Sequence, residues 1–152
     1  MKKVLRVLSL FVMVGALASL TSCKKDNADT IIGKWAFDKI TMSVETDDPE
    51  IEALMNEYID YYIAETNDEM QGMTYEFKED GTCTIYYPAF DDEEEYEYTT
   101  TYSVDGDKLT MEDETITIKT LNKNQLIFEE VEEDEEDGIS YKLTMTVEFK
   151  RA

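Results

Sequence analysis

The stretch Ile139–Phe149 reads ISYKLTMTVEF, in which apolar and polar residues alternate over eleven positions. Because successive side chains of a β-strand point to opposite faces, this alternation predicts a strand with one buried and one exposed face. The same period of two starts at Met73, where Met73, Tyr75 and Phe77 alternate with polar residues. The second half of the chain is therefore expected to consist of half-buried strands.

Between these two segments the alternation recurs in short runs that polar turns separate. Short turns with Gly or Asn connect antiparallel neighbours. An earlier run at Ile31–Glu45, which includes Trp35 and Phe37, indicates a long first strand and brings the predicted strands to eight. The intervening runs cover residues 83–87, 95–104, 109–111, 115–119 and 126–128, with turns at 79–81, 105–106 and 122–124.

One helix is predicted between the first and second strands. Asp48 is a good N-cap, Pro49 suits the first helical position, and Glu50 favours the positive end of the helix dipole. Apolar residues then follow at helical spacing, and Gly72 provides a stop. The residues expected to form one inward-facing stripe are Ile51, Leu54, Met55, Tyr58, Ile59 and Tyr62.

Eight antiparallel strands in hairpin order, interrupted by a single helix, indicate a mainly β domain. Such strands can close into an up-and-down barrel that is wide enough for packed side chains or one small ligand. Closure would also remove the exposed edges that an open meander leaves. The alternative architecture is an open sandwich of two sheets.

Gly33, Lys34 and Trp35, at the start of the first strand, resemble the Gly-x-Trp signature of lipocalins. The resemblance extends in outline over residues 31–152 and implies an eight-stranded barrel that Gly33 and Trp35 close at one end. Arg151 is the candidate for the arginine that stacks on this tryptophan in the family. The helix after the first strand departs from lipocalins and is similar to the helical insertion of fatty-acid-binding proteins. The family resemblance implies a module that binds a small ligand. No enzyme activity and no cofactor are expected.

Residues 1–22 have the features of a secretory signal peptide, because Lys2, Lys3 and Arg6 precede an apolar run and no acid is present. That run, Val7–Leu20, would measure about 20 Å as a helix, whereas a hydrocarbon core is about 30 Å thick. It is therefore too short to be a good permanent membrane anchor.

The apolar run ends at Leu20–Cys23, which reads LTSC and resembles the lipobox of bacterial lipoproteins. The resemblance implies that Cys23 is acylated and that residues 23–30 tether the domain to a membrane. Lys24 stands where an aspartate would imply retention in the inner membrane, so an outer-membrane lipoprotein of a Gram-negative bacterium is expected. The short charged stretch after Cys23 is similar to signals that export lipoproteins to the cell surface, which implies exposure there. The alternative is an ordinary signal peptide that is cleaved near an incidental cysteine.

The composition excludes several classes of function. Removal of the leader, which holds three cations and no acid, would take the formal net charge from −22 to −25, so nucleic acid is not an expected partner. The chain has no histidine, which excludes Ser-His and Cys-His catalysis and histidine metal sites. Once Cys23 is acylated, Cys83 is the one remaining cysteine, so no disulfide can form within the chain.

Acidic residues gather in two runs, Asp91–Glu97 and Glu129–Asp137, which are expected in loops or at strand ends. Runs of like charge repel one another and are usually solvated. The alternative is weak calcium binding, although neither run has EF-hand spacing. Paired carboxylates could also serve a glycosidase, but among 36 acids such pairs arise by chance. No metal site and no catalytic residue is therefore assigned.

Five residues are candidates for a ligand pocket, because the alternation points them towards the barrel interior: Phe37, Lys39, Tyr75, Tyr98 and Tyr102. Tyrosines can stack on a ligand, but cross-strand aromatic pairs also stabilise a sheet. In an unbroken strand, Lys39 would share the inward face of Phe37. Its ammonium group would then need a ligand carboxylate or an internal acid as partner. A β-bulge could instead turn Lys39 outward and bring Ile40, Met42 and Val44 in, which is the preferred interpretation.

Two functions remain open. The first is a module that binds a small apolar or amphipathic ligand, with the helix as a lid. The second is a surface adaptor or accessory subunit with a filled barrel, which interacts through its acidic loops. An interior cavity of about 300 Å³ or more would favour the first function.

Overall fold

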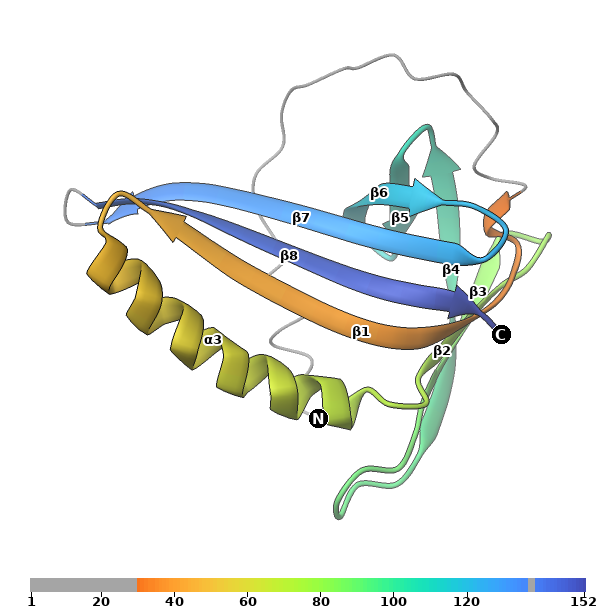
Figure 1. Cartoon of the computed structure of the whole chain (residues 1–152). Helices are drawn as coiled ribbons and strands as arrows, with labels where there is room; N and C mark the ends of the chain where they lie inside the picture. The colour runs from red at the N-terminus through yellow and green to blue at the C-terminus, as the bar shows by residue number, and fades with distance from the viewer. Residues whose placement is uncertain (1–29, 137–138) are drawn as a thin grey trace.

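The computed structural model describes residues 30–136 and 139–152, so the predicted leader, Cys23 and most of the tether lie outside the described residues. Within the described part, eight strands and one long helix follow one another in the predicted order (Figure 1). The elements are β1 (Gly33–Thr46), α3 (Pro49–Glu69), β2 (Thr74–Phe77), β3 (Thr82–Tyr87), β4 (Tyr96–Asp105), β5 (Lys108–Met111), β6 (Glu114–Leu121), β7 (Gln125–Glu136) and β8 (Ile139–Arg151).

Each strand pairs in antiparallel fashion with the next one along the chain, and β8 pairs with β1, so the sheet closes into a barrel. This closure confirms the predicted up-and-down barrel and excludes the open sandwich. Apolar side chains of alternating positions are buried, as expected for half-buried strands. Those of the barrel strands include Trp35, Phe37, Tyr75, Phe77, Cys83, Ile85, Tyr87, Leu109, Met111, Ile118, Leu126, Phe128 and Phe149.

Three of the strands continue beyond the barrel. β2 pairs with β1 only over Gly33–Ala36, and β6 pairs with β7 only as far as Glu129. Past these points β1, β8 and β7 remain paired with one another as a three-stranded extension, and α3 runs along it (Figure 1). We call this extension the arm and define it as residues 39–46, 130–136 and 139–148.

A β-bulge marks the start of the arm. The register between β1 and β8 shifts between Phe37 and Lys39, which leaves Asp38 as an extra residue. Because one extra residue reverses the facing of every residue that follows, Ile40 and Val44 are buried whereas Lys39 is exposed. The structure therefore confirms the bulge, which was the preferred interpretation of the sequence.

The first strand begins at Gly33, two residues later than predicted. Thr30 and Ile31 have helical geometry, and the indole N–H of Trp35 donates to the carbonyl of Ile31 at 2.7 Å. Ile31 is fully buried, because the chain folds over the end of the barrel here instead of extending β1.

The acidic run Glu129–Asp137, expected in a loop or at a strand end, lies mostly within β7. Its backbone pairs with β8 as far as Glu136, and this hydrogen bonding does not depend on side chains. Beyond Glu129, no described strand pairs with the other edge of β7. Charged residues suit such an edge because they discourage pairing with another molecule.

Helix α3 begins as predicted. The carboxylate of Asp48 accepts hydrogen bonds from the N–H groups of Glu50 and Ile51, at 2.9 and 3.3 Å, and Pro49 occupies the first turn. The helix ends at Glu69. No helix in the described ranges is long and apolar enough to cross a membrane.

The predicted inward stripe of α3 is wrong for two of its residues, since Leu54 and Tyr58 are 69% and 73% exposed. The buried side chains of the helix are instead Ile59, Ile63 and Thr66. This rotation turns two asparagines towards β1.

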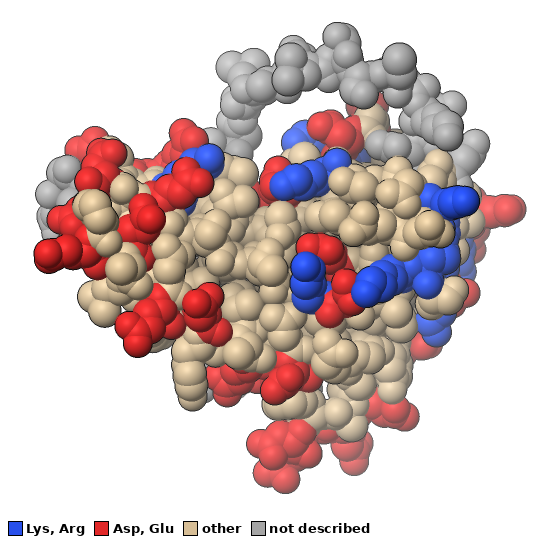
Figure 2. Space-filling view, viewed as in Figure 1, with Lys and Arg blue, Asp and Glu red and all other residues tan. Residues whose placement is uncertain are grey.

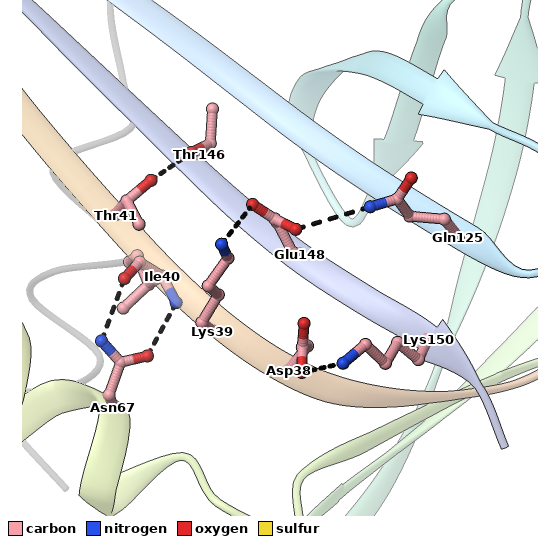
Figure 3. A network of polar contacts seen from close by, with 9 residues as sticks. All are labelled: Asp38, Lys39, Ile40, Thr41, Asn67, Gln125, Thr146, Glu148 and Lys150. Atoms are coloured by element: carbon pink, nitrogen blue, oxygen red, sulfur yellow. Dashed lines mark hydrogen bonds and ion pairs between the residues drawn. The ribbon is translucent and has the colours of Figure 1, made fainter.

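Asn56 and Asn67 attach α3 to the edge of β1. The Asn67 amide accepts from the N–H of Ile40 at 2.8 Å and donates to its carbonyl at 2.9 Å (Figure 3). The Asn56 amide makes the same pair of bonds with Val44, at 3.1 and 3.0 Å. Because β2 does not reach this part of β1, the two amides replace a neighbouring strand and satisfy its backbone groups. We call these two bonded pairs the asparagine clasps.

Candidate functional site

One end of the barrel is sealed by Trp35. Its side chain is fully buried, and the guanidinium carbon of Arg151 lies 3.9 Å from the centre of its ring. The guanidinium group also donates to the carbonyls of Ile32 and Thr30, at 2.8 and 3.1 Å, which ties the end of the chain to the start of the domain. Gly33 has a φ of 124°, and a Cβ there would collide with the Arg151 side chain. Glycine adopts this φ without strain and leaves the Arg151 side chain in place.

Aromatic rings pack against one another above this closed end. The ring of Tyr75 lies 4.9 Å from that of Phe149, and Phe37 contacts Phe149 edge-on at 6.0 Å. The rings of Phe77 and Tyr102 form another edge contact at 4.9 Å, and the Tyr102 hydroxyl donates to the backbone of Lys78. Of the predicted pocket residues, Phe37, Tyr75 and Tyr102 thus pack with other aromatic side chains of the domain.

The opposite end carries a wall of three tyrosines on β3 and β4. Tyr87 and Tyr96 are directly paired across the strands, and their rings stack at 4.8 Å with an angle of 6°. Tyr98 follows Tyr96 on the same face of β4, and its ring is also nearly parallel to the other two. We call Tyr87, Tyr96 and Tyr98 the tyrosine wall. Tyr98, a predicted pocket residue, is 38% exposed and so is accessible from outside.

Glu130 lies where β7 leaves the barrel. It follows Leu126 and Phe128 at alternate positions, so it shares their inward face, and it is half-buried. Burial, together with the charges of Glu132 and Glu114, raises the pKa of the Glu130 carboxyl to about 7.

The tyrosine wall and these carboxylates are electrostatic neighbours. Burial raises the pKa of Tyr98 to about 12, and the negative charges of Glu112 and Glu114 contribute to the shift. Glu114 also acts on Glu130. We call the end of the barrel opposite Trp35 the open end; it combines stacked phenol rings with acidic groups, of which Glu130 faces inward.

Lys39, which the sequence named as a pocket residue, lies on the outer face of the arm instead. Its ammonium group pairs with Glu148 at 3.2 Å, and Glu148 also contacts Gln125 (Figure 3). Next to it, Lys150 pairs with Asp38 at 2.7 Å. The bulge is the physical reason, because it places the charged residues of β1 opposite those of β8 on the solvent side.

The buried cysteine is unreactive near neutral pH. Cys83 is fully buried and free, and burial raises the pKa of its thiol to about 12, so the thiol stays protonated near neutral pH. In the part of the chain that the structure describes, no group of three or more Asp, Glu or Cys side chains is arranged to hold a metal ion.

The sequence missed Glu130 because it stands inside a run of eight acids among nine residues, which hides the alternation of Leu126, Phe128 and Glu130. The sequence pattern gave no indication of Glu114, since its proximity to Glu130 depends on the register in which β6 pairs with β7. Tyr87 and Tyr96 lie in predicted strands, but their stacking depends on the register of β3 and β4.

The sequence profile of a family described as a lipocalin-like domain matches residues 31–128. The match covers more than half of the chain and runs from the start of the barrel to Phe128 in β7. No curated protein matches the chain.

Proposed function

Because the chain belongs to the lipocalin-like domain family, we propose that it binds a small ligand at the open end of its barrel without catalysing a reaction. The contrast between the two ends supports this function. Trp35 and Arg151 seal one end, whereas the other presents the tyrosine wall with Tyr98 accessible. Flat aromatic faces beside a few polar groups are typical of small-molecule sites.

The test is a comparison of two tyrosine variants by native mass spectrometry and calorimetric titration. Tyr98→Ala removes the accessible part of the wall, so we expect it to lose any small molecule that co-purifies with the chain. Tyr61→Ala is the matched control, because Tyr61 lies on the outer side of α3 and is 75% exposed. Equal retention by both variants, or no bound molecule in the native protein, would refute binding at this end.

We further propose that the domain works at the outer membrane, exposed on the cell surface and held there through acylated Cys23. The leader, Leu20–Cys23 and Lys24 support this address. Cys23→Ser is expected to move the protein from the membrane fraction to the soluble fraction, and mass spectrometry of the N-terminal peptide should detect acyl chains only in the native chain. An unacylated Cys23 would contradict the anchor.

A surface adaptor is the second candidate, and one feature of α3 favours it. Leu54, Tyr58 and Tyr61 are exposed at spacings of four and three residues, which places them on one side of the helix. Exposed acids accompany them on a helix that has no lysine or arginine. Tyr58→Gln with Tyr61→Gln would weaken a protein contact and leave ligand binding unchanged, whereas Tyr98→Ala would do the opposite.

A further inference from the structure

Glu130 has no counter-charge in the described chain. Neither a lysine nor an arginine pairs with it, and no hydrogen bond from a described residue reaches its carboxylate. Every basic residue of the described ranges is placed elsewhere. Lys39, Lys119, Lys142 and Lys150 pair with Glu148, Glu129, Glu45 and Asp38; Lys78 and Lys108 donate to threonines; Arg151 covers Trp35; Lys34 and Lys123 are exposed near the closed end.

Whether an acid of a strand forms one of these ion pairs depends on the face of the sheet to which it points. Glu129 is adjacent to Glu130 in β7 but faces the other way, and it pairs with Lys119 of β6. Figure 2 shows basic side chains gathered over β1 and β8 near the barrel, whereas acidic side chains dominate the tip of the arm. In the described ranges, none of the lysines that form ion pairs reaches the inward-facing Glu130.

In the absence of a ligand, ionisation of Glu130 is electrostatically unfavourable. Its carboxylate is half-buried, and the charges of Glu132 and Glu114 add to the cost of ionisation. A buried charge without a partner destabilises a fold, and such a group is often found where a ligand supplies the missing charge. The tyrosine wall lies at the same end of the barrel as Glu130, and aromatic faces of this kind attract cations.

We propose that the ligand is an apolar molecule with a cationic nitrogen, which places its ammonium group at Glu130 and its apolar part along the tyrosine wall. This inference rests on the ligand-binding function proposed above and specifies its ligand class. Glu112, Glu114 and Glu132 would repel a carboxylate or phosphate head group, so fatty acids and other anionic lipids are poor ligands. The phenol faces of Tyr96 and Tyr98 add a cation–π attraction to the charge of Glu130.

Three probes with the same alkyl chain test the charge preference: dodecylammonium, dodecanol and dodecanoate. They are titrated below micelle-forming concentration into the chain carrying Cys23→Ser, purified without detergent, and heat is measured by calorimetry. Dodecylammonium should bind about tenfold more tightly than dodecanol, and dodecanoate should bind most weakly.

Variants of β7 then locate the preference. Glu130→Gln should bring the affinity for dodecylammonium down to that for dodecanol and leave dodecanol binding unchanged. Glu130→Lys should reverse the order in favour of dodecanoate. Glu133→Gln, which removes an exposed acid from the opposite face of the same strand, should change none of the affinities. Circular dichroism confirms that each variant is folded.

The outcomes separate this inference from the function on which it rests. If dodecanoate binds as tightly as dodecylammonium, or if Glu130→Gln leaves the preference intact, the cationic ligand is refuted while ligand binding stands. If no probe binds and the native protein carries no molecule, both proposals fail.

Discussion

The two ends of the barrel differ in how their polar groups are satisfied. At the closed end, Trp35 and Arg151 make hydrogen bonds to backbone carbonyls and stack on each other. At the open end, Glu130 faces inward beside other acids and has no described counter-charge. Strands β7 and β8 run between these two ends. The contacts at the closed end stabilise the fold, whereas ionisation of Glu130 at the open end destabilises it. Proteins retain such local costs mainly at functional sites.

The largest effect is expected at the closed end. Trp35→Ala would leave a cavity beneath Arg151 and remove a buried hydrogen bond, so the free energy of unfolding should fall by about 3–5 kcal/mol. Urea denaturation followed by circular dichroism measures this change. The exposed Tyr61→Ala should stay within about 0.5 kcal/mol of the native protein. A loss below about 1 kcal/mol for Trp35→Ala would show that this end does not carry the stability of the barrel.

The asparagine clasps come next, because they attach α3 to the arm that extends beyond the barrel. Asn67→Ala would leave the N–H and carbonyl groups of Ile40 without their partner, at a cost of about 1–3 kcal/mol. Hydrogen exchange by NMR should show faster exchange at the Ile40 amide and little change at Cys83, deep in the barrel. Unchanged protection of Ile40 would mean that the clasp is dispensable.

Loss of the N-cap of α3 should lower the free energy of unfolding by less than loss of an asparagine clasp. Asp48→Ala removes the acceptor for the first helical N–H groups and should cost about 1 kcal/mol. Asp47→Ala is the control, because Asp47 carries the same charge next to the helix and makes neither cap bond. Equal losses for the two variants in urea denaturation would attribute the effect to charge near the helix dipole instead of to the cap.

The smallest expected change in stability depends on pH and arises from Glu130 alone. Its pKa rises from an ordinary 4.5 to about 7 on folding, so between these values the folded chain keeps a proton that the unfolded chain has lost. This group therefore lowers stability as pH rises from about 4.5 to about 7, and the full penalty applies above pH 7. Glu130→Gln has no such penalty.

We expect Glu130→Gln to be more stable than the native chain at pH 8, by less than about 1 kcal/mol because the side chain is partly solvated. At pH 4.5 the two chains should be nearly equal. Urea denaturation at both pH values measures the difference. The same difference at both would show that Glu130 titrates as an ordinary surface acid.

Much of the fold could be predicted from local patterns. Alternation located the strands from Met73 onward, and Asp48 with Pro49 located the start of α3, because both signals depend on residues that are neighbours in the chain. The same alternation selected Phe37, Tyr75 and Tyr102 as inward residues, and each of them contacts other aromatic side chains. It could not say that these three pack mainly with protein side chains, since that depends on which strands meet across the barrel.

The sequence by itself determined the number, order and apolar face of the strands, because side-chain parity is a property of the extended backbone. Only the tertiary structure decided the bulge after Phe37, the rotation of α3 and the sign of charge inside the open end. The first two depend on hydrogen bonds between segments that are distant in sequence, such as Asn67 with Ile40 or β8 with β1, and the third depends on the register in which β6 pairs with β7. The pattern of β1 alone could therefore point a lysine inward, whereas the assembled sheet turns Lys39 to solvent and leaves Glu130 facing in.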